Sequence, residues 1–123
     1  MTTASRPSMP LGETIFTQRA IRRMRSVPIP DADLQVILEA AIRAPSGSNT
    51  QPWHFLVVRD PELRAQLGVL YREAWWAKRK DEGINGPEDI PLGKNTRRSA
   101  MRLSDEIGGA PVIVLLCATS RGP

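Results

Sequence analysis

Two stretches of the chain combine residue types that could bind a flat, anionic ligand. The first, residues 17–24, has the sequence Thr-Gln-Arg-Ala-Ile-Arg-Arg-Met and places Arg19 and Arg22 three positions apart. A guanidinium is a planar fork of donors that can bind a phosphate through two parallel hydrogen bonds. The stretch is therefore either an anion site or a solvated basic turn, and its residues alone favour the turn.

The second stretch, residues 43–53, has the sequence Arg-Ala-Pro-Ser-Gly-Ser-Asn-Thr-Gln-Pro-Trp. Gly47 permits close approach of a flat ligand to the backbone. Ser46, Asn49 and Gln51 supply donors and acceptors just before an expected strand, so they could match the polar edge of a heteroaromatic ring without adding charge. An ordinary helix-to-strand connection is the alternative, and these residues alone leave the two interpretations balanced.

The chain lacks the common catalytic constellations. It has one histidine and one cysteine, so neither a histidine-rich metal site nor a cysteine cluster is expected. No nucleophile elbow, Walker A loop or G-x-G-x-x-G fingerprint is present. We therefore expect the chemistry to belong to a bound cofactor, with no catalytic side chain and no metal ligand assigned.

The composition is typical of a soluble globular protein. The chain has 123 residues, enough for one domain, with 41% hydrophobic and 24% charged residues. Its longest apolar run, residues 111–118, is much shorter than the roughly 20 residues of a membrane helix, so no membrane partner is expected. Cys117 lies in this run and is expected to be a buried, reduced thiol, which favours a cytoplasmic protein.

The formal net charge of +4 indicates anionic partners, which include phosphate-bearing cofactors and nucleic acid. A small basic nucleic-acid-binding protein is thus a rival interpretation. Against it, only 5% of the residues are aromatic, and they do not alternate with the basic ones. We therefore expect a small-molecule ligand and no nucleic acid.

Periodicity and turn residues predict four helices and two strands after a flexible leader over residues 1–10. Asp31 is the expected N-cap of the second helix, and Asp60 that of the third. The last strand is expected to be buried on both faces. Since two strands alone do not make a stable sheet, a C-terminal continuation or a partner subunit is expected. The predicted elements are helices 12–18, 31–43, 61–80 and 95–107 and strands 53–59 and 111–118.

The order and spacing of these motifs resemble the FMN-dependent nitroreductase family. The likeness extends from about residue 16 to residue 67, and its most specific part is the string Ala-Pro-Ser-Gly-Ser-Asn-Thr-Gln-Pro-Trp at residues 44–53. Gly-Ala-Pro-Val at residues 109–112, leading into an apolar strand, is similar to a later element of that family. Between these parts the match is looser.

The resemblance implies an α+β nitroreductase-like fold with an incomplete central sheet flanked by helices. Residues 11–123 would form the N-terminal part of that domain, with its C-terminal half missing. It also implies a homodimer that binds FMN between its subunits. NAD(P)H would be the co-substrate, and nitroaromatics, quinones or similar electron-poor small molecules would be the acceptors.

The resemblance also implies which residues bind the cofactor. Arg19 matches the arginine that binds the FMN phosphate, and Arg22 matches a basic residue near the pyrimidine edge of the flavin. The positions that line the isoalloxazine ring match Pro45, Ser46 and Asn49, with Asn49 bonding to its polar edge.

The chain departs from the family pattern beside Arg19. Many members have Arg-Arg-Ser where residues 18–20 are Gln-Arg-Ala, so Ala20 keeps a cofactor-binding position without its hydroxyl. Loss of a charge-assisted bond costs about 1.5–3 kcal/mol of cofactor affinity if nothing replaces it.

Three points stay open at the level of sequence. The deiodinase-like or flavin-destroying branches of the same superfamily are alternatives to a nitroreductase. Trp75 or Trp76 could stack on an aromatic substrate, although packing within the protein is the favoured interpretation. His54 is expected to be a half-exposed strand residue, and the basic stretch 94–102 a solvated helix face.

Overall fold

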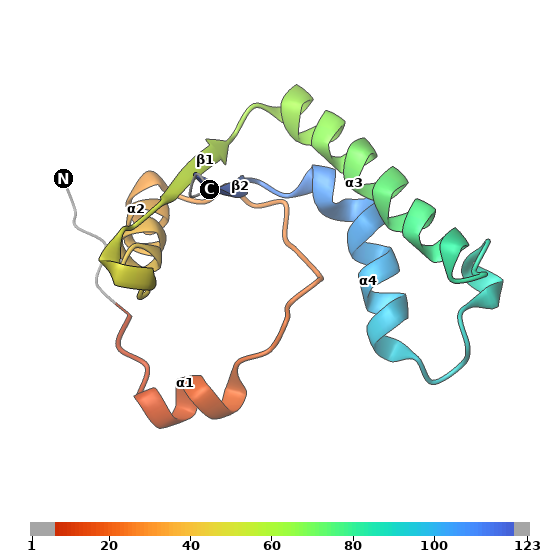
Figure 1. The fold of residues 1–123 in the computed structure, drawn as a ribbon, viewed down its shortest axis with the longest axis horizontal. Coiled ribbons are helices and arrows are strands. Elements are labelled where there is room, and N and C mark those ends of the chain that lie inside the picture. Colours follow the sequence, from red (N-terminus) through yellow and green to blue (C-terminus); the bar gives the residue numbers. More distant parts are fainter. Residues whose placement is uncertain (1–6, 120–123) are drawn as a thin grey trace. The chain divides into compact units, whose positions relative to one another are not determined.

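The computed structural model describes residues 7–119 (Figure 1). The order of its helices and strands is the predicted one, which confirms the α+β class. The leader expected over residues 1–10 lies outside the described residues except for 7–10. The helices are α1 (Leu11–Thr17), α2 (Asp31–Ala41), α3 (Pro61–Asp81) and α4 (Asn95–Glu106), the strands are β1 (Trp53–Val58) and β2 (Ile113–Ala118), and the 3-10 turns are η1 (Gly47–Asn49), η2 (Pro87–Asp89) and η3 (Ile107–Gly109).

The described chain divides into two compact units. The first unit contains residues 7–19, 28–57 and 114–119, and the second contains residues 20–27 and 58–113. Residues 46–51, which we name the Ser/Asn/Gln loop, belong to the first unit. So do the two strands, apart from Val58 and Ile113. The packed pair of long helices belongs to the second.

The first unit is organised by the pairing of β1 with β2 in a two-stranded sheet. The Thr119 N–H donates to the Pro52 carbonyl at 3.0 Å, so the end of β2 lies beside the start of β1. The strands therefore run antiparallel, and residues more than 50 positions apart meet directly after the Ser/Asn/Gln loop.

The burial expected for β2 is wrong. Of its six residues only Ile113 is half-buried, and the remaining five, including Cys117, are exposed. The described sheet gives β2 one neighbouring strand and leaves its apolar side chains largely uncovered, with Leu116 at 68% exposure. The apolar run correctly predicted a strand but not its surroundings, because hydrophobicity does not report which other elements are available to cover it.

Helix α2 forms as predicted but begins and ends differently. Its N-cap is Pro30, whose carbonyl accepts from the Leu34 N–H at 3.1 Å, so the expectation that Asp31 caps the helix is wrong. Asp31 is instead the first helical residue, where its charge favours the positive end of the helix dipole. The helix ends at Ala41, two residues before the predicted Arg43.

In the second unit, α3 begins as its sequence predicts. The Asp60 carboxylate accepts a hydrogen bond from the Leu63 N–H at 2.9 Å, and Pro61 occupies the first helical position. Capping satisfies a backbone donor that has no partner inside the helix. The predicted helix over residues 61–80 is confirmed as Pro61–Asp81.

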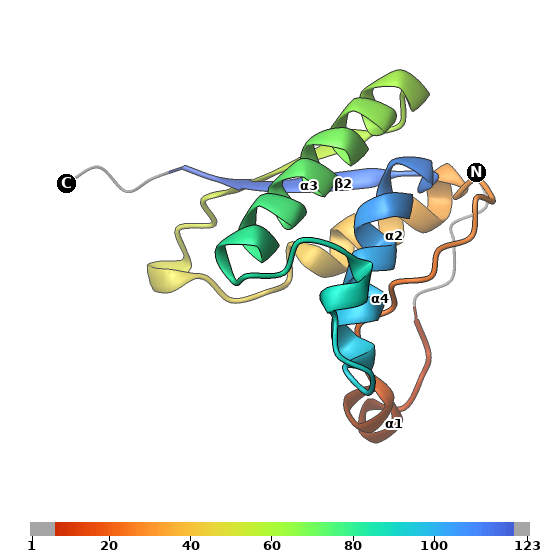
Figure 2. The same cartoon turned by 90° about the vertical axis from the view of Figure 1, so that its right-hand side faces the viewer.

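Helices α3 and α4 lie side by side in both views of the fold (Figures 1 and 2). Directly after α4, Gly108 of η3 meets Gly68 of α3: a Cβ added to Gly68 would lie 2.8 Å from the Gly108 Cα. A Cβ on Gly108 would in turn lie 3.2 Å from the Arg64 carbonyl oxygen. The absence of both side chains therefore allows this contact between backbones.

A small core accompanies that contact. Ile84, Ile90 and Ala110 are buried, and Ser104 is buried with its hydroxyl donating to the Met101 carbonyl at 2.7 Å. The Arg64 guanidinium donates to the Ala110 carbonyl and so ties α3 to the segment that leads into β2. Ala110, three residues before β2, is thereby fixed to α3.

Replacing Gly68 with alanine should destabilise the protein by about 1–3 kcal/mol, because the new methyl group would overlap the Gly108 backbone. This loss exceeds the gain of up to about 1 kcal/mol that alanine brings to a helix interior. Urea unfolding followed by circular dichroism measures the change. Gly109→Ala is the matched control, since a Cβ at Gly109 meets nothing within 4 Å; equal stabilities of the two variants would refute the packing argument.

Candidate functional site

The loop between α2 and β1 is organised by hydrogen bonds that converge on Gln51. The Gln51 backbone N–H donates to the Ser46 hydroxyl oxygen at 2.9 Å, and the Gln51 side-chain amide donates to Asn49 Oδ1 at 3.0 Å. The Asn49 N–H donates to the Ser46 carbonyl at 2.9 Å. Two of the predicted ring-lining residues, Ser46 and Asn49, are thus held together, and Pro45 directly precedes them.

The backbone of this loop is strained. Ser48 and Asn49 have φ of 54° and Gln51 has φ of 48°, so three non-glycine residues lie in the left-handed region. This conformation costs roughly 1–2 kcal/mol per residue, with asparagine tolerating it best. Gly47, the one glycine here, is not among the left-handed residues. Such strain persists when surrounding contacts fix the loop, and it is often found at binding sites.

The loop leaves polar groups that fit a flavin ring. Asn49 is exposed, and within residues 7–119 its side-chain N–H₂ makes no hydrogen bond, so it can donate to a ring carbonyl. Ser46 is half-buried, and its hydroxyl accepts from Gln51 while keeping its own O–H to donate. The Pro45 ring adds an exposed apolar surface without a competing donor. These residues are compatible with an uncharged, carbonyl-bearing ring edge.

The predicted residues of the basic segment, which comprises residues 17–24, fall in both units. Arg19 belongs to the first unit and is exposed, and among residues 7–119 no hydrogen bond or ion pair joins its side chain to the Ser/Asn/Gln loop. Ala20 and Arg22 belong to the second unit, where Ala20 is exposed and Arg22 is half-buried. Their roles toward a cofactor stay predictions.

Arg22 lies in a pocket of the second unit that the sequence did not predict. The pocket has a volume of about 220 Å³ and is lined by Arg22, Arg23, Arg98, Ser99 and Arg102. The stretch 94–102 was expected to be a solvated face, yet residues 97–100 are half-buried. The i, i+4 spacing of Arg98 and Arg102 was the available signal, since it places both side chains on one face of α4.

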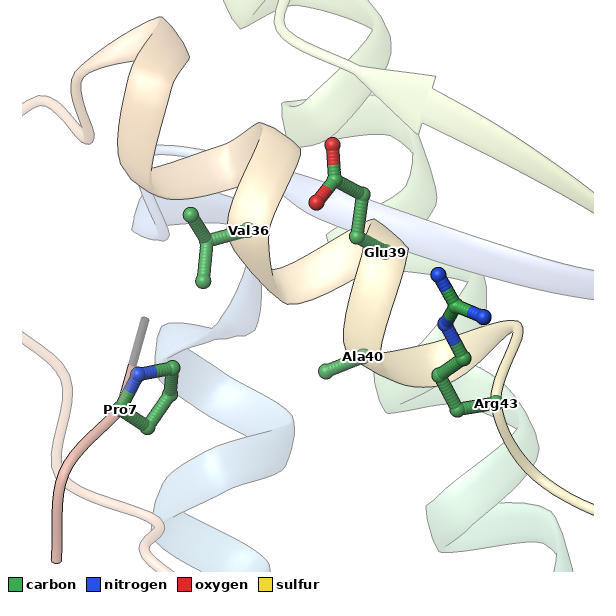
Figure 3. Close-up of a pocket in the computed structure, with 5 residues that line it drawn as sticks. All are labelled: Pro7, Val36, Glu39, Ala40 and Arg43. Carbon is green, nitrogen blue, oxygen red and sulfur yellow. The ribbon is translucent and has the colours of Figure 1, made fainter. Parts of the chain in front are cut away.

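A second pocket, of about 390 Å³, lies in the first unit (Figure 3). It contains none of the predicted site residues, and Figure 3 shows Val36, Glu39 and Ala40 reaching it from α2. Pro7 and Arg43 complete the lining. Its mixture of aliphatic and charged groups includes no constellation with a recognisable reaction.

The sequence did not predict that Gln51 holds the loop together through internal hydrogen bonds. Gln51 was identified as a possible ligand-facing donor, whereas in the structure it bonds with both Ser46 and Asn49. A glutamine close to a serine and an asparagine in a turn-rich stretch indicates polarity. Which of the three side chains bonds within the loop, and which faces a ligand, depends on backbone angles that the sequence does not report.

Trp75 and Trp76 contact each other edge to face, with ring centroids 4.9 Å apart. The Arg79 guanidinium lies 5.2 Å from the Trp75 ring centroid, and both tryptophans are half-buried. These contacts agree with packing within the protein, the interpretation that the sequence favoured. His54 is exposed on β1.

Among residues 7–119, no helix is long and apolar enough to cross a membrane. The same residues contain no group of three or more histidine, cysteine, aspartate or glutamate side chains arranged to hold a metal ion.

Comparison with protein families decides the affiliation. The nitroreductase family model matches residues 15–122, which include both the basic segment and the Ser/Asn/Gln loop. The chain belongs to the nitroreductase family.

Individual relatives of this nitroreductase-family chain carry different names. An NADH dehydrogenase of Thermus thermophilus is 45% identical over 64 residues, covering 52% of this chain and 31% of that protein. Iodotyrosine deiodinase 1 of Rattus norvegicus is 36% identical over 107 residues, covering 85% of this chain and 35% of that protein. The chain therefore spans about a third of the length of these curated relatives.

A solved structure agrees with the fold. A BluB-like flavoprotein from Clostridium difficile 630 superposes with a TM-score of 0.60 at 24% sequence identity, covering 94% of this chain and 52% of that one. The arrangement of helices and strands is therefore that of nitroreductase-like proteins, over about half the length of the solved chain.

Replacing Ser46 with alanine should expose the Gln51 amide to solvent exchange, because its acceptor is lost. A hydrogen bond of about 0.5–1.5 kcal/mol corresponds to an increase in exchange of roughly two- to tenfold. Hydrogen exchange followed by NMR at the Gln51 N–H measures this. Ser48→Ala is the control, because the Ser48 hydroxyl has no hydrogen bond within residues 7–119; unchanged Gln51 exchange in the Ser46 variant would contradict the loop geometry.

Proposed function

We propose that the chain is part of an FMN-dependent oxidoreductase that uses NAD(P)H to reduce nitroaromatic, quinone or similar electron-poor small molecules. The observation that supports this most is the hydrogen-bonded, strained loop at residues 46–51, found within a family match over residues 15–122. A loop fixed before binding presents its donors without further ordering cost.

The chain's own residues would bind and orient the cofactor. Asn49 donates its side-chain amide to the polar edge of the ring, Ser46 holds the loop in place, and Pro45 packs against the ring face. Arg19 binds the phosphate, and Arg22 supplies positive charge toward the pyrimidine edge. When bound, FMN supplies the redox chemistry, taking a hydride from NAD(P)H and passing electrons to the acceptor.

The side chains present are consistent with a protein that binds the cofactor and leaves the redox chemistry to it. The loop offers hydrogen-bond donors of fixed orientation but no group that must gain or lose a proton. The name of the Thermus thermophilus relative, NADH dehydrogenase, supports a nicotinamide co-substrate. We also propose that the protein is a cytoplasmic homodimer. Apolar side chains are exposed on β2 and, separately, on α3, for example Leu116 and Leu70, and these support contact with a second subunit.

A second candidate is reductive dehalogenation of an iodinated aromatic. It is favoured by the match to rat iodotyrosine deiodinase 1, which extends over 85% of this chain. Iodide release from iodotyrosine and NAD(P)H-dependent reduction of a quinone are separate assays on the same protein. Iodide release without quinone reduction would favour the deiodinase.

Replacing Arg19 with alanine should weaken FMN binding by about tenfold or more, because a charge-assisted bond to the phosphate is worth about 1.5–3 kcal/mol. Quenching of flavin fluorescence during titration measures the dissociation constant. Arg25→Ala is the control, since it removes the same charge from an exposed arginine that directly follows the basic segment and is not assigned to the flavin site. Equal affinities of the two variants would remove Arg19 from the site.

A further inference from the structure

The arginine pocket, formed by Arg22 and Arg23 together with Arg98, Ser99 and Arg102 of α4, concentrates positive charge in the second unit. Four of its five lining residues carry guanidinium groups, and none carries a carboxylate. Arg22, Arg98 and Ser99 are half-buried, whereas Arg23 and Arg102 are exposed. The pocket therefore combines a partly desolvated wall with an open, charged side.

Three other arginines of the same unit are paired with carboxylates. Their partners lie at 2.7–3.1 Å: Arg72 with Asp105, Arg79 with Glu82, and Arg97 with Glu82. Within residues 7–119, by contrast, none of the four pocket arginines forms an ion pair. The cluster is therefore not simply a consequence of a basic sequence.

Like charges held close together repel one another, and a bound anion would relieve that repulsion. The position of one wall is fixed independently of any ligand, because Arg98 Nη2 donates to the Ile90 carbonyl at 3.0 Å, and Ile90 is 1% exposed. Arg98 is thus tied to the most buried part of the second unit. Arg102, one turn further along α4, makes no such bond within residues 7–119, so its donors are available to a ligand.

We propose that this pocket binds a phosphate monoester dianion. Guanidinium forks match tetrahedral oxyanions through paired hydrogen bonds, and four of them suit two negative charges better than the single charge of a carboxylate. The Ser99 hydroxyl adds a donor of adjustable direction. The volume of about 220 Å³ accommodates a phosphate group and favours one group over an extended nucleic-acid strand.

Three sources share this chemistry: the phosphate of FMN, the 2′-phosphate of NADPH, and free inorganic phosphate. Four of the lining residues, Arg23, Arg98, Ser99 and Arg102, are not among the residues assigned to flavin binding, whereas Arg22 belongs to both sets. The inference does not rest on the proposed oxidoreductase activity, because inorganic phosphate alone tests it.

The experiment is a titration of the full chain with inorganic phosphate at low ionic strength, followed by NMR of the arginine side-chain N–H groups. We expect saturable shifts at Arg98 and Arg102, and a dissociation constant about fivefold or more higher in Arg102→Gln. The control is Arg97→Gln, which removes the same charge from the neighbouring face of α4 and should leave the constant unchanged. Absence of saturable shifts, or equal weakening in both variants, would overturn the proposal.

The same variants identify the source. If Arg102→Gln weakens binding of NADP⁺ but not of NAD⁺, the pocket takes the 2′-phosphate. If it weakens binding of FMN but not of riboflavin, the pocket takes the flavin phosphate. An effect confined to inorganic phosphate assigns the pocket to the free ion. Failure of FMN to bind at all, with phosphate binding intact, would count against the proposed function and leave the pocket standing.

Discussion

The second unit depends on the contact between Gly68 and Gly108. Because neither residue has a side chain, the backbone of η3 can approach α3 more closely than any other residue would allow. This contact positions the end of α4, and the Arg64 bond to the Ala110 carbonyl then fixes the start of the segment that becomes β2. The position of α4, which carries three of the five residues lining the arginine pocket, therefore depends on a backbone contact that has no chemical role itself.

The Ser/Asn/Gln loop depends on a different balance. Three left-handed residues raise its free energy, and hydrogen bonds from Gln51 to Ser46 and Asn49 offset part of that cost. A loop built in this way has its donors oriented before a ligand arrives, which is the arrangement that a flat cofactor with a polar edge requires. The bonds that stabilise the strained loop are thus the same ones that orient its groups toward the proposed cofactor.

Helices were the most predictable part of the structure. The cap at Asp60 depends on local chemistry and lies where the sequence placed it, and α4 ends at Glu106, one residue before its predicted end. Burial was less predictable, as exposed Cys117 shows, because it depends on which elements surround a strand. In the site, the residue types of the loop were evident from sequence, but the internal role of Gln51 depends on backbone angles. The arginine pocket joins residues about 75 positions apart, and no local pattern reports such a contact.

The central claim is that this chain contains the cofactor-binding elements of a flavin-dependent reductase. Its most direct test is the visible absorption spectrum of the purified chain after FMN is added and the excess is removed, followed by anaerobic addition of NAD(P)H. The account predicts a retained flavin spectrum that bleaches when NAD(P)H is added. A colourless protein would contradict the claim that these residues form a flavin site.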